Sequence, residues 1–327
     1  MAVTELAKRV GSAGFYAICS LTIVVVNKLV LTSYEFPSEV LALGQMTATI
    51  IILALGKLCK VVDFPSLSMD TIYKIFPLPL IFFFNSVCGL GGTKRLNLPM
   101  FTVLRRFSIL MTMLLEQFLL GNAHRWKKQL SVYMMIFGAL VAAWYDLSFN
   151  LPGYIMIFLS DIATALNGVY TMKKLQAKSL GKYGILFYNS LFMLLPTILF
   201  VSYTGGIEQA RNAPWMDPVF SAQFTTSCIM GFVLNYSVVL CTLHNSALTT
   251  TIVGVMKNIV VTYLGMFIGG DYIFDIMNFV GLNISAAASV VYSYLEFKPS
   301  SEPETPEKPP DTSTANSNEN SEEIVTA

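Results

Sequence analysis

The chain has 327 residues, of which 54% are hydrophobic and 13% are charged, and its formal net charge is +1. Because roughly a quarter of the residues in a soluble protein are charged, this composition excludes an ordinary soluble domain and indicates an integral membrane protein. The apolar segments leave little room for a soluble catalytic domain.

Apolar segments of spanning length follow one another from Gly11 almost to Phe297, and a helix needs about 20 mainly apolar residues to cross a bilayer. We interpret the first segment as a helix and not as a signal peptide, because it has full spanning length and lacks a small-residue cleavage pattern. The sequence predicts an all-α membrane fold of ten helices, over residues 11–32, 37–58, 72–93, 98–120, 129–146, 150–172, 184–203, 221–242, 246–268 and 276–297.

Basic residues in the segments between these helices are distributed unevenly, which predicts the topology. If the N-terminus is cytosolic, the cytosolic side holds Lys8, Arg9, Lys57, Lys60, Lys74, Arg125, Lys127, Lys128, Lys173, Lys174, Lys178, Lys182, Lys298 and Lys308. The opposite side holds Lys94, Arg95 and Arg211. This bias favours an even number of helices and two cytosolic termini.

The two halves of the chain resemble each other weakly. A shift of 146 residues aligns Val26–Leu29 with Met172–Leu175, and a shift of 150 aligns Phe84–Ser86 with Leu234–Tyr236. Five helices per half is an odd number, so the second half enters the membrane from the other face. Inverted repeats of this kind are common in secondary transporters, where the substrate lies between the halves near the membrane midplane.

Residues 299–327 differ in composition from the rest, with seven acidic residues, five prolines and one lysine. This segment is typical of a disordered cytosolic tail, with a solubilising role or, alternatively, a role in trafficking. We therefore divide the chain into a cytosolic N-terminus (1–10), a first repeat (11–148), a second repeat (149–298) and the tail (299–327).

Charged residues inside the predicted helices are mostly basic. A charge at the bilayer centre costs about 2.5–3.5 kcal/mol, so each one needs a partner or a function. The basic residues are Lys28, Arg105, Arg106 and Lys257, and the acidic ones are Glu116 and Asp161. Two positive charges remain even if both acids are paired, which suits an anionic solute. For Arg105 and Arg106, bonding to helix carbonyls or to an acid of another helix is the alternative.

The helix over 246–268 places Lys257 near its middle, beside a stripe of small and polar residues. The stripe consists of Thr250, Gly254, Asn258, Thr262, Gly265 and Gly269. Small residues also permit close helix packing without a ligand. Lysine is a compact cation suited to phosphate, so Lys257 is the first candidate for phosphate binding.

The helix over 184–203 begins with an aromatic and polar cluster. Tyr188 offers a ring for stacking, and Asn189 and Ser190 offer donors and acceptors for a base edge. An interfacial aromatic belt is the alternative interpretation.

Other chemistry finds little support. The five cysteines form no CxxC pair and the two histidines are far apart, so we expect no metal site and no cofactor. Glu116 and Asp161 make a poor catalytic pair, so we expect no enzyme. The small residues of the helix over 276–297 indicate helix packing, with a homodimer face as the alternative.

These residues lie in longer runs that resemble the nucleotide-sugar transporters of solute carrier family 35, in the drug/metabolite transporter superfamily. The runs are Val24–Lys28, Leu96–Arg106, Leu180–Gly184, Phe187–Ser190 and Gly269–Phe274. The resemblance is to the subgroup that carries UDP-glucuronic acid, UDP-N-acetylgalactosamine and UDP-N-acetylglucosamine. It implies a ten-helix fold and exchange of a cytosolic nucleotide sugar for a lumenal nucleoside monophosphate.

The resemblance also implies site residues. In the GDP-mannose branch, a Phe-Tyr-Asn-Asn motif reads the base and a Gly-Ala-Leu-Asn-Lys motif holds phosphate and sugar. The matching stretches here are Phe187–Ser190 and Gly254–Asn258. Ser190 replaces the second base-reading Asn, and Lys257 and Asn258 stand in reversed order. These departures argue against guanine and fit uracil.

We therefore expect an antiporter that moves UDP-sugars into the Golgi or endoplasmic reticulum lumen in exchange for UMP, by alternating access, with no nucleic-acid partner. Lys257 would pair with the diphosphate, and Tyr188, Asn189 and Ser190 would hold uracil and ribose. The remaining candidates, expected to attract or contact the other groups of the substrate, are Asn27, Lys28, Arg105, Arg106, Gly254 and Asn258. A carrier of other phosphorylated organic anions and a non-transporting sensor or scaffold are the alternatives, and the preferred UDP-sugar stays open.

Overall fold

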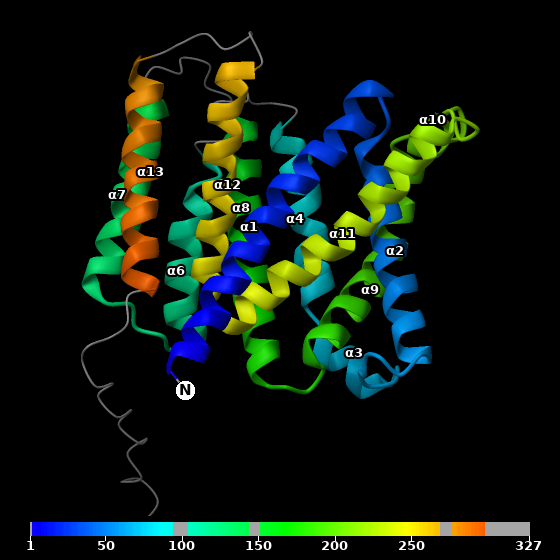
Figure 1. Ribbon diagram of the computed structural model, residues 1–327, viewed down its shortest axis with the longest axis horizontal. Helices are drawn as coiled ribbons and strands as arrows, with labels where there is room; N and C mark the ends of the chain where they lie inside the picture. The colour runs from blue at the N-terminus through cyan, green and yellow to red at the C-terminus, as the bar shows by residue number, and fades with distance from the viewer. Residues whose placement is uncertain (1, 94–103, 144–150, 269–275, 298–327) are drawn as a thin grey trace, which may run out of the picture. The chain divides into compact units, whose positions relative to one another are not determined.

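The long apolar runs fold as α-helices, which satisfy their own backbone hydrogen bonds where water is absent. The computed structural model describes residues 2–93, 104–143, 151–268 and 276–297, and within this part there is no β-strand (Figure 1). These residues belong to one unit, Met1–Phe297, and the tail predicted at 299–327 lies outside the described residues. The described helices are α1 (Ala2–Ser33), α2 (Ser38–Leu58), α3 (Met69–Ile75), α4 (Leu78–Thr93), α6 (Phe107–Leu120), α7 (Trp126–Ala143), α8 (Leu151–Gln176), α9 (Gly181–Tyr203), α10 (Gly206–Arg211), α11 (Pro218–His244), α12 (Ala247–Ile268) and α13 (Ile276–Phe297).

Five of the described helices are long and apolar enough to cross a membrane. These spans are Thr4–Leu31, Ser38–Leu58, Leu151–Gln176, Gly181–Tyr203 and Pro218–His244. Phe107–Leu120 and Ala247–Lys257 are shorter apolar helices. Each of the ten predicted segments contains a described helix, while the number that spans the bilayer stays a prediction.

Two of the predicted segments are interrupted, so the expectation of one continuous helix was wrong in both. Residues 72–93 divide at Phe76, where α3 ends and the backbone is extended (ψ 138°). Pro77 follows, and a proline removes a helical N–H and disfavours helical geometry in the residue before it. In the segment over 98–120, residues 98–103 lie outside the described residues; Arg105 and Arg106 form a turn, and helix α6 begins at Phe107 with Arg106 as its N-cap residue.

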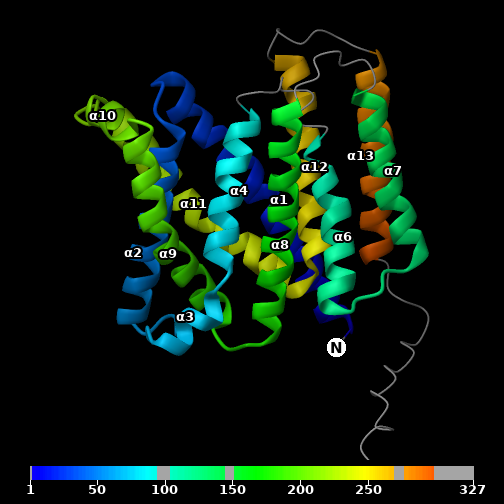
Figure 2. The same cartoon turned by 180° about the vertical axis from the view of Figure 1, so that it is seen from behind.

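Helices that are distant in sequence pack side by side. Figures 1 and 2 both show α7 beside α13 at one edge of the bundle, and α2 and α9 lie together near the opposite edge. A Cβ added at Gly281 of α13 would lie 2.4 Å from the backbone nitrogen of Ala142 and 2.4 Å from the carbonyl oxygen of Gly138, both on α7. Glycine is therefore required for the two backbones to meet this closely.

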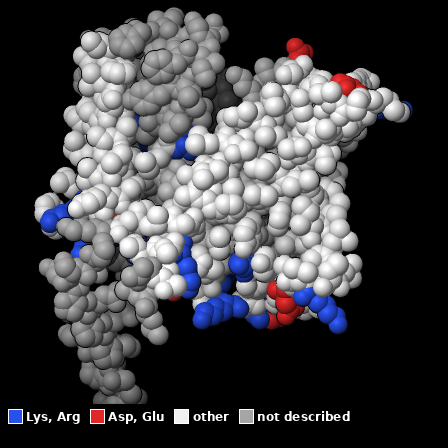
Figure 3. All heavy atoms as spheres, in the orientation of Figure 1, with Lys and Arg blue, Asp and Glu red and all other residues white. Residues whose placement is uncertain are grey.

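Polar contacts join the helix ends at the face where α1 begins. Glu296 of α13 forms ion pairs with Arg9 of α1 and with Lys128 of α7, the latter at 2.5 Å. Asn245, between α11 and α12, donates to the carbonyl oxygen of Arg9 at 3.2 Å and to Ser12 Oγ at 3.1 Å. Figure 3 shows that lysine and arginine side chains gather along this lower edge of the molecule. These contacts tie α1, α7, α13 and the connection between α11 and α12 together at the basic face.

Candidate functional site

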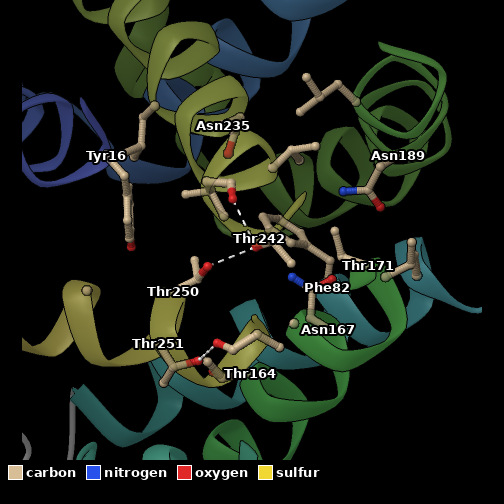
Figure 4. Close-up of a pocket in the computed structure, with 18 of the residues that line it drawn as sticks. Tyr16, Phe82, Thr164, Asn167, Thr171, Asn189, Asn235, Thr242, Thr250 and Thr251 are labelled. Carbon is tan, nitrogen blue, oxygen red and sulfur yellow. Dashed lines mark hydrogen bonds between the residues drawn. The ribbon is translucent and has the colours of Figure 1, made fainter. Parts of the chain in front are cut away.

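A cavity of about 480 Å³ lies inside the bundle. Small-molecule sites generally occupy about 300–1,000 Å³, so this space can hold a metabolite of substantial size. Its lining side chains come from α1, α2, α4, α8, α9, α11 and α12, together with the start of α6. Figure 4 shows side chains from several of these helices converging on the same space, among them Tyr16, Asn189 and Thr250.

The charge of the cavity is positive. Arg105, Arg106 and Lys257 line it, and none of the described lining residues is acidic. The three residues come from two distant parts of the sequence that the fold brings together. Because charges act over longer range in a poorly hydrated site than in water, this arrangement favours an anionic ligand.

Arg105 is held against α8. Its Nη1 donates to Ser160 Oγ at 2.8 Å and to Thr164 Oγ1 at 3.3 Å. The same nitrogen lies 3.7 Å from a carboxylate oxygen of Asp161, and the Arg105 side chain is 31% exposed. The guanidinium group therefore has neutral and acidic neighbours on α8 while remaining accessible from the cavity.

The turn at Arg105 and Arg106, just before α6, adds to the positive character of the site. Arg106 is the N-cap residue of α6 and Ser108 lies in its first turn, and both line the cavity. A helix N-terminus carries partial positive charge, and discontinuous membrane helices often direct such an end toward an anionic substrate group. The turn thus places the basic side chain of Arg106 and the N-terminus of α6 together at the cavity, and both favour an anion.

Helix α12 contributes the small and polar face that the sequence pattern indicated. Thr250, Thr251, Gly254 and Lys257 line the cavity. A Cβ at Gly254 would lie 2.8 Å from the hydroxyl oxygen of Tyr16, so glycine gives this α1 side chain room against α12. Thr242 donates to Thr250 at 3.1 Å, which joins α11 to α12 at the cavity wall (Figure 4).

Helix α9 directs only part of its predicted cluster inward. Asn189 and Ser190 line the cavity, whereas Tyr188 is 1% exposed and is not among the lining residues. The Tyr188 hydroxyl donates to the carbonyl oxygen of Pro65 at 2.6 Å, and its ring packs edge-on against Phe64. The ring that the sequence assigned to a base is packed in the core.

Tyr16 and Phe82 are aromatic residues that line the cavity and that sequence reasoning missed (Figure 4). Nothing in the local sequence separates them from the many other aromatic residues of the helices. The chain has 15 tyrosines and 23 phenylalanines, so type alone could not identify them.

Three further candidates do not contribute described side chains to the cavity wall. Asn27 Oδ1 accepts from Gln45 Nε2 at 3.2 Å and from Ser227 Oγ at 2.6 Å. Since Gln45 lines the cavity, Asn27 supports the wall from behind. The side chains of Lys28 and Asn258 lie outside the described residues.

The fully buried Glu116 has a structural position that its sequence context did not reveal. Its carboxylate accepts from the backbone N–H groups of Ala247 at 3.2 Å and Leu248 at 3.3 Å, at the start of α12. A carboxylate at a helix N-terminus satisfies donors that have no partner within the helix. Glu116 therefore anchors the helix that carries Lys257.

Comparison with known proteins gives a consistent result over nearly the whole chain. A family model described as the Triose-phosphate Transporter family matches residues 12–293. The UDP-sugar transporter UST74c of Drosophila melanogaster is 56% identical over 93% of this chain and 82% of its own length. The human nucleotide sugar transporter SLC35D2 is 52% identical over 88% of this chain and 86% of its own length.

A solved structure, described as the crystal structure of a protein, shares the fold. Its TM-score is 0.61 at 12% identity, and the match covers 88% of this chain and 98% of the other.

Proposed function

This chain belongs to the Triose-phosphate Transporter family, and from this membership we propose that it is an antiporter that moves UDP-sugars from the cytosol into the Golgi or endoplasmic reticulum lumen in exchange for UMP. Its relatives named as UDP-sugar transporters, in Drosophila melanogaster and Caenorhabditis elegans, are 56% and 54% identical to it. Similarity at this level over most of both chains supports the same substrate class. The relatives are transporters and not enzymes by name, which agrees with a carrier function.

The observation that carries this proposal is the charge of the cavity. A UDP-sugar presents a dianionic diphosphate between a neutral base and a sugar. Arg105, Arg106 and Lys257 supply positive charge at one cavity, and no described lining residue opposes it. Arginine binds phosphate oxygens with a planar fork and lysine binds as a point charge, so the set suits two adjacent phosphates.

The neutral part of the cavity suits the nucleoside. We assign Asn189 and Ser190 to uracil and ribose, because amide and hydroxyl groups can both donate and accept hydrogen bonds. Phe82 offers the aromatic face, while Tyr188 holds α9 in place through its bond to Pro65. Gly254 keeps the wall open beside Lys257. Lys28 and Asn258 remain assigned to the substrate by sequence resemblance.

The proposed architecture is ten membrane helices in two inverted repeats, over 11–148 and 149–298, with cytosolic termini. In this arrangement the helices α1, α2, α4, α6 and α7 of the first repeat correspond, in that order, to α8, α9, α11, α12 and α13 of the second. Helix contacts support the correspondence, because the most extensively packed pairs of helices have counterparts that are also in contact. Helix α1 packs on α11 and α12, and correspondingly α8 packs on α4 and α6. The basic edge at the start of α1 supports a cytosolic N-terminus (Figure 3).

The same charges provide a physical route to exchange. In an empty carrier, closing the cavity brings its positive groups into a drier space and raises their mutual repulsion. Bound phosphate relieves that cost, so substrate and product both favour the closed state. A ligand shifts an equilibrium only through its different affinities for the two states, and here the difference comes from the phosphate.

Transport by the purified protein in liposomes tests this proposal. Uptake of a panel of labelled UDP- and GDP-sugars is measured into vesicles preloaded with UMP and into vesicles without nucleotide. We expect uptake of at least one UDP-sugar, stimulated by internal UMP, and little uptake of GDP-sugars. Uptake that is independent of internal UMP would overturn antiport, and failure of every UDP-sugar would overturn the substrate class.

A further inference from the structure

Asp161 on α8 is a buried carboxylate to which the proposed mechanism gives no role. It is 1% exposed, and neither of its oxygens has a hydrogen-bond partner among the described residues. Its closest basic neighbour in that part of the chain is Arg105, whose Nη1 lies 3.7 Å from Oδ1. A carboxylate buried in this way needs a positive group to offset its desolvation, and Arg105 supplies one.

The surroundings of Asp161 place it behind Arg105 and not in the substrate cavity. Asp161 does not line the central cavity but lines a second one, of about 340 Å³, at the side of α6 and α8. The remaining wall of this second cavity is made largely of apolar side chains, including Leu104, Phe107 and Phe158. Arg105 thus has Asp161 in apolar surroundings on one side and the substrate cavity on the other.

Neutral groups reinforce the position of Arg105 on α8. Ser160 and Thr164 accept from its Nη1, and both hydroxyls donate to Asn85 Oδ1 on α4, at 2.7 and 3.1 Å. Each hydroxyl therefore accepts from the arginine and donates to the asparagine. This chain of hydrogen bonds joins α4, α8 and the segment before α6 through one guanidinium group.

We propose that Asp161 is a positioning residue that holds Arg105 against α8 when the cavity is empty and yields it to substrate phosphate during transport. The proposal rests on the proposed function, because it requires a phosphate in the cavity. Arg105 is accessible from the cavity and its contact with Asp161 is loose, at 3.7 Å. A phosphate can form shorter, bidentate bonds with the guanidinium group, so binding would weaken the contact with α8.

Competition between Asp161 and phosphate affects binding and release in opposite ways. The empty carrier loses part of an ion pair when substrate binds, which weakens binding. The same ion pair re-forms when substrate leaves, which assists release. Removing the negative charge should therefore strengthen binding and slow turnover.

Kinetics of the Asp161→Asn variant test this inference. In UDP-sugar/UMP exchange we expect KM to fall roughly three- to tenfold and kcat to fall as well, since a partly buried ion pair of this kind has a modest energy. Asp161→Glu, which keeps the charge, should remain close to wild type in KM. In an Arg105→Gln background, Asp161→Asn should cause no further fall in KM, because the competed group is gone.

An unchanged or raised KM in Asp161→Asn would overturn the inference, as would an equal fall in KM in the Arg105→Gln background. If Asp161→Asn does not fold, Ser160→Ala is used instead, because it removes another contact that holds Arg105. Ser160→Ala should also lower KM, and an unchanged KM in this variant would overturn the inference. Wild-type exchange is measured first. Its absence refutes the proposed function, whereas normal wild-type exchange with unaltered variants refutes only the role of Asp161.

Discussion

Replacing Glu116 by glutamine tests how α12 is anchored beside the cavity. The carboxylate lies 3.2 and 3.3 Å from the backbone nitrogens of Ala247 and Leu248, the first two residues of α12. His124 Nε2 lies 3.4 Å from Oε2 of Glu116, the oxygen that also accepts from Leu248. Glutamine is nearly isosteric, but it has no charge, and its NH₂ group cannot accept a hydrogen bond.

The magnitude follows from these contacts. Loss of a buried charge at a helix N-terminus costs about 1–2 kcal/mol. One of the two backbone N–H groups would face the amide nitrogen, and an unsatisfied buried donor costs about 1–3 kcal/mol. We therefore expect a loss of about 2–5 kcal/mol. At roughly 2 °C per kcal/mol, the melting temperature of Glu116→Gln should fall by about 4–10 °C.

Thermal unfolding of the purified protein in detergent measures this shift. Gln117→Ala is the matched control, because Gln117 is the next residue of α6 and is exposed. We also expect KM for exchange to rise in Glu116→Gln, because α12 carries Lys257 and would lose its anchor at Glu116. A melting temperature equal to that of the control would refute the anchoring role of Glu116.

Two further comparisons test packing and the assignment of α9. Gly281→Ala should lower the melting temperature by several degrees, because the added methyl group overlaps the α7 backbone. Gly14→Ala is the control and should have little effect, because a Cβ there meets nothing within 4 Å. Equal shifts in melting temperature would contradict the close contact between α7 and α13. Tyr188→Phe should lose about 1 kcal/mol of stability with little change in KM, whereas Asn189→Ala should raise KM several-fold. Exchange kinetics separate these two, and a large rise in KM in Tyr188→Phe with none in Asn189→Ala would contradict this assignment, because the Tyr188 hydroxyl and not Asn189 would then contact the substrate.

The sequence predicted the positions of the helices well, because long apolar runs in a membrane have few alternatives to helix. It failed at two interruptions. Pro77 was visible in the sequence and should have suggested a break, since the preceding residue is restricted to extended geometry. The turn at Arg105 and Arg106 had no comparable local signal.

The site was partly predictable for a related reason. Basic residues inside membrane helices require an explanation, and Arg105, Arg106 and Lys257 do line the cavity. A sequence motif gives no reliable helix face, however. Adjacent residues differ by about 100° around a helix, so Tyr188 and Asn189 point in different directions although one motif contains both.

Glu116 and Asp161 were not assigned because their neighbours lie far away in the sequence. Glu116 binds backbone groups more than 100 residues later, at positions where any residue type has the same N–H. Asp161 neighbours Arg105 only after α8 packs beside the segment before α6. Contacts of this kind depend on the tertiary arrangement and leave no pattern in a single sequence.

The central claim is that the positive cavity binds the phosphates of a nucleotide sugar, and Lys257 tests it most directly. UDP-sugar/UMP exchange in liposomes is compared for wild type, Lys257→Ala and Lys127→Ala, the last being a change at an exposed lysine at the start of α7. We predict that Lys257→Ala loses exchange while it folds and inserts normally, and that Lys127→Ala retains it. Unchanged exchange by Lys257→Ala would contradict the account.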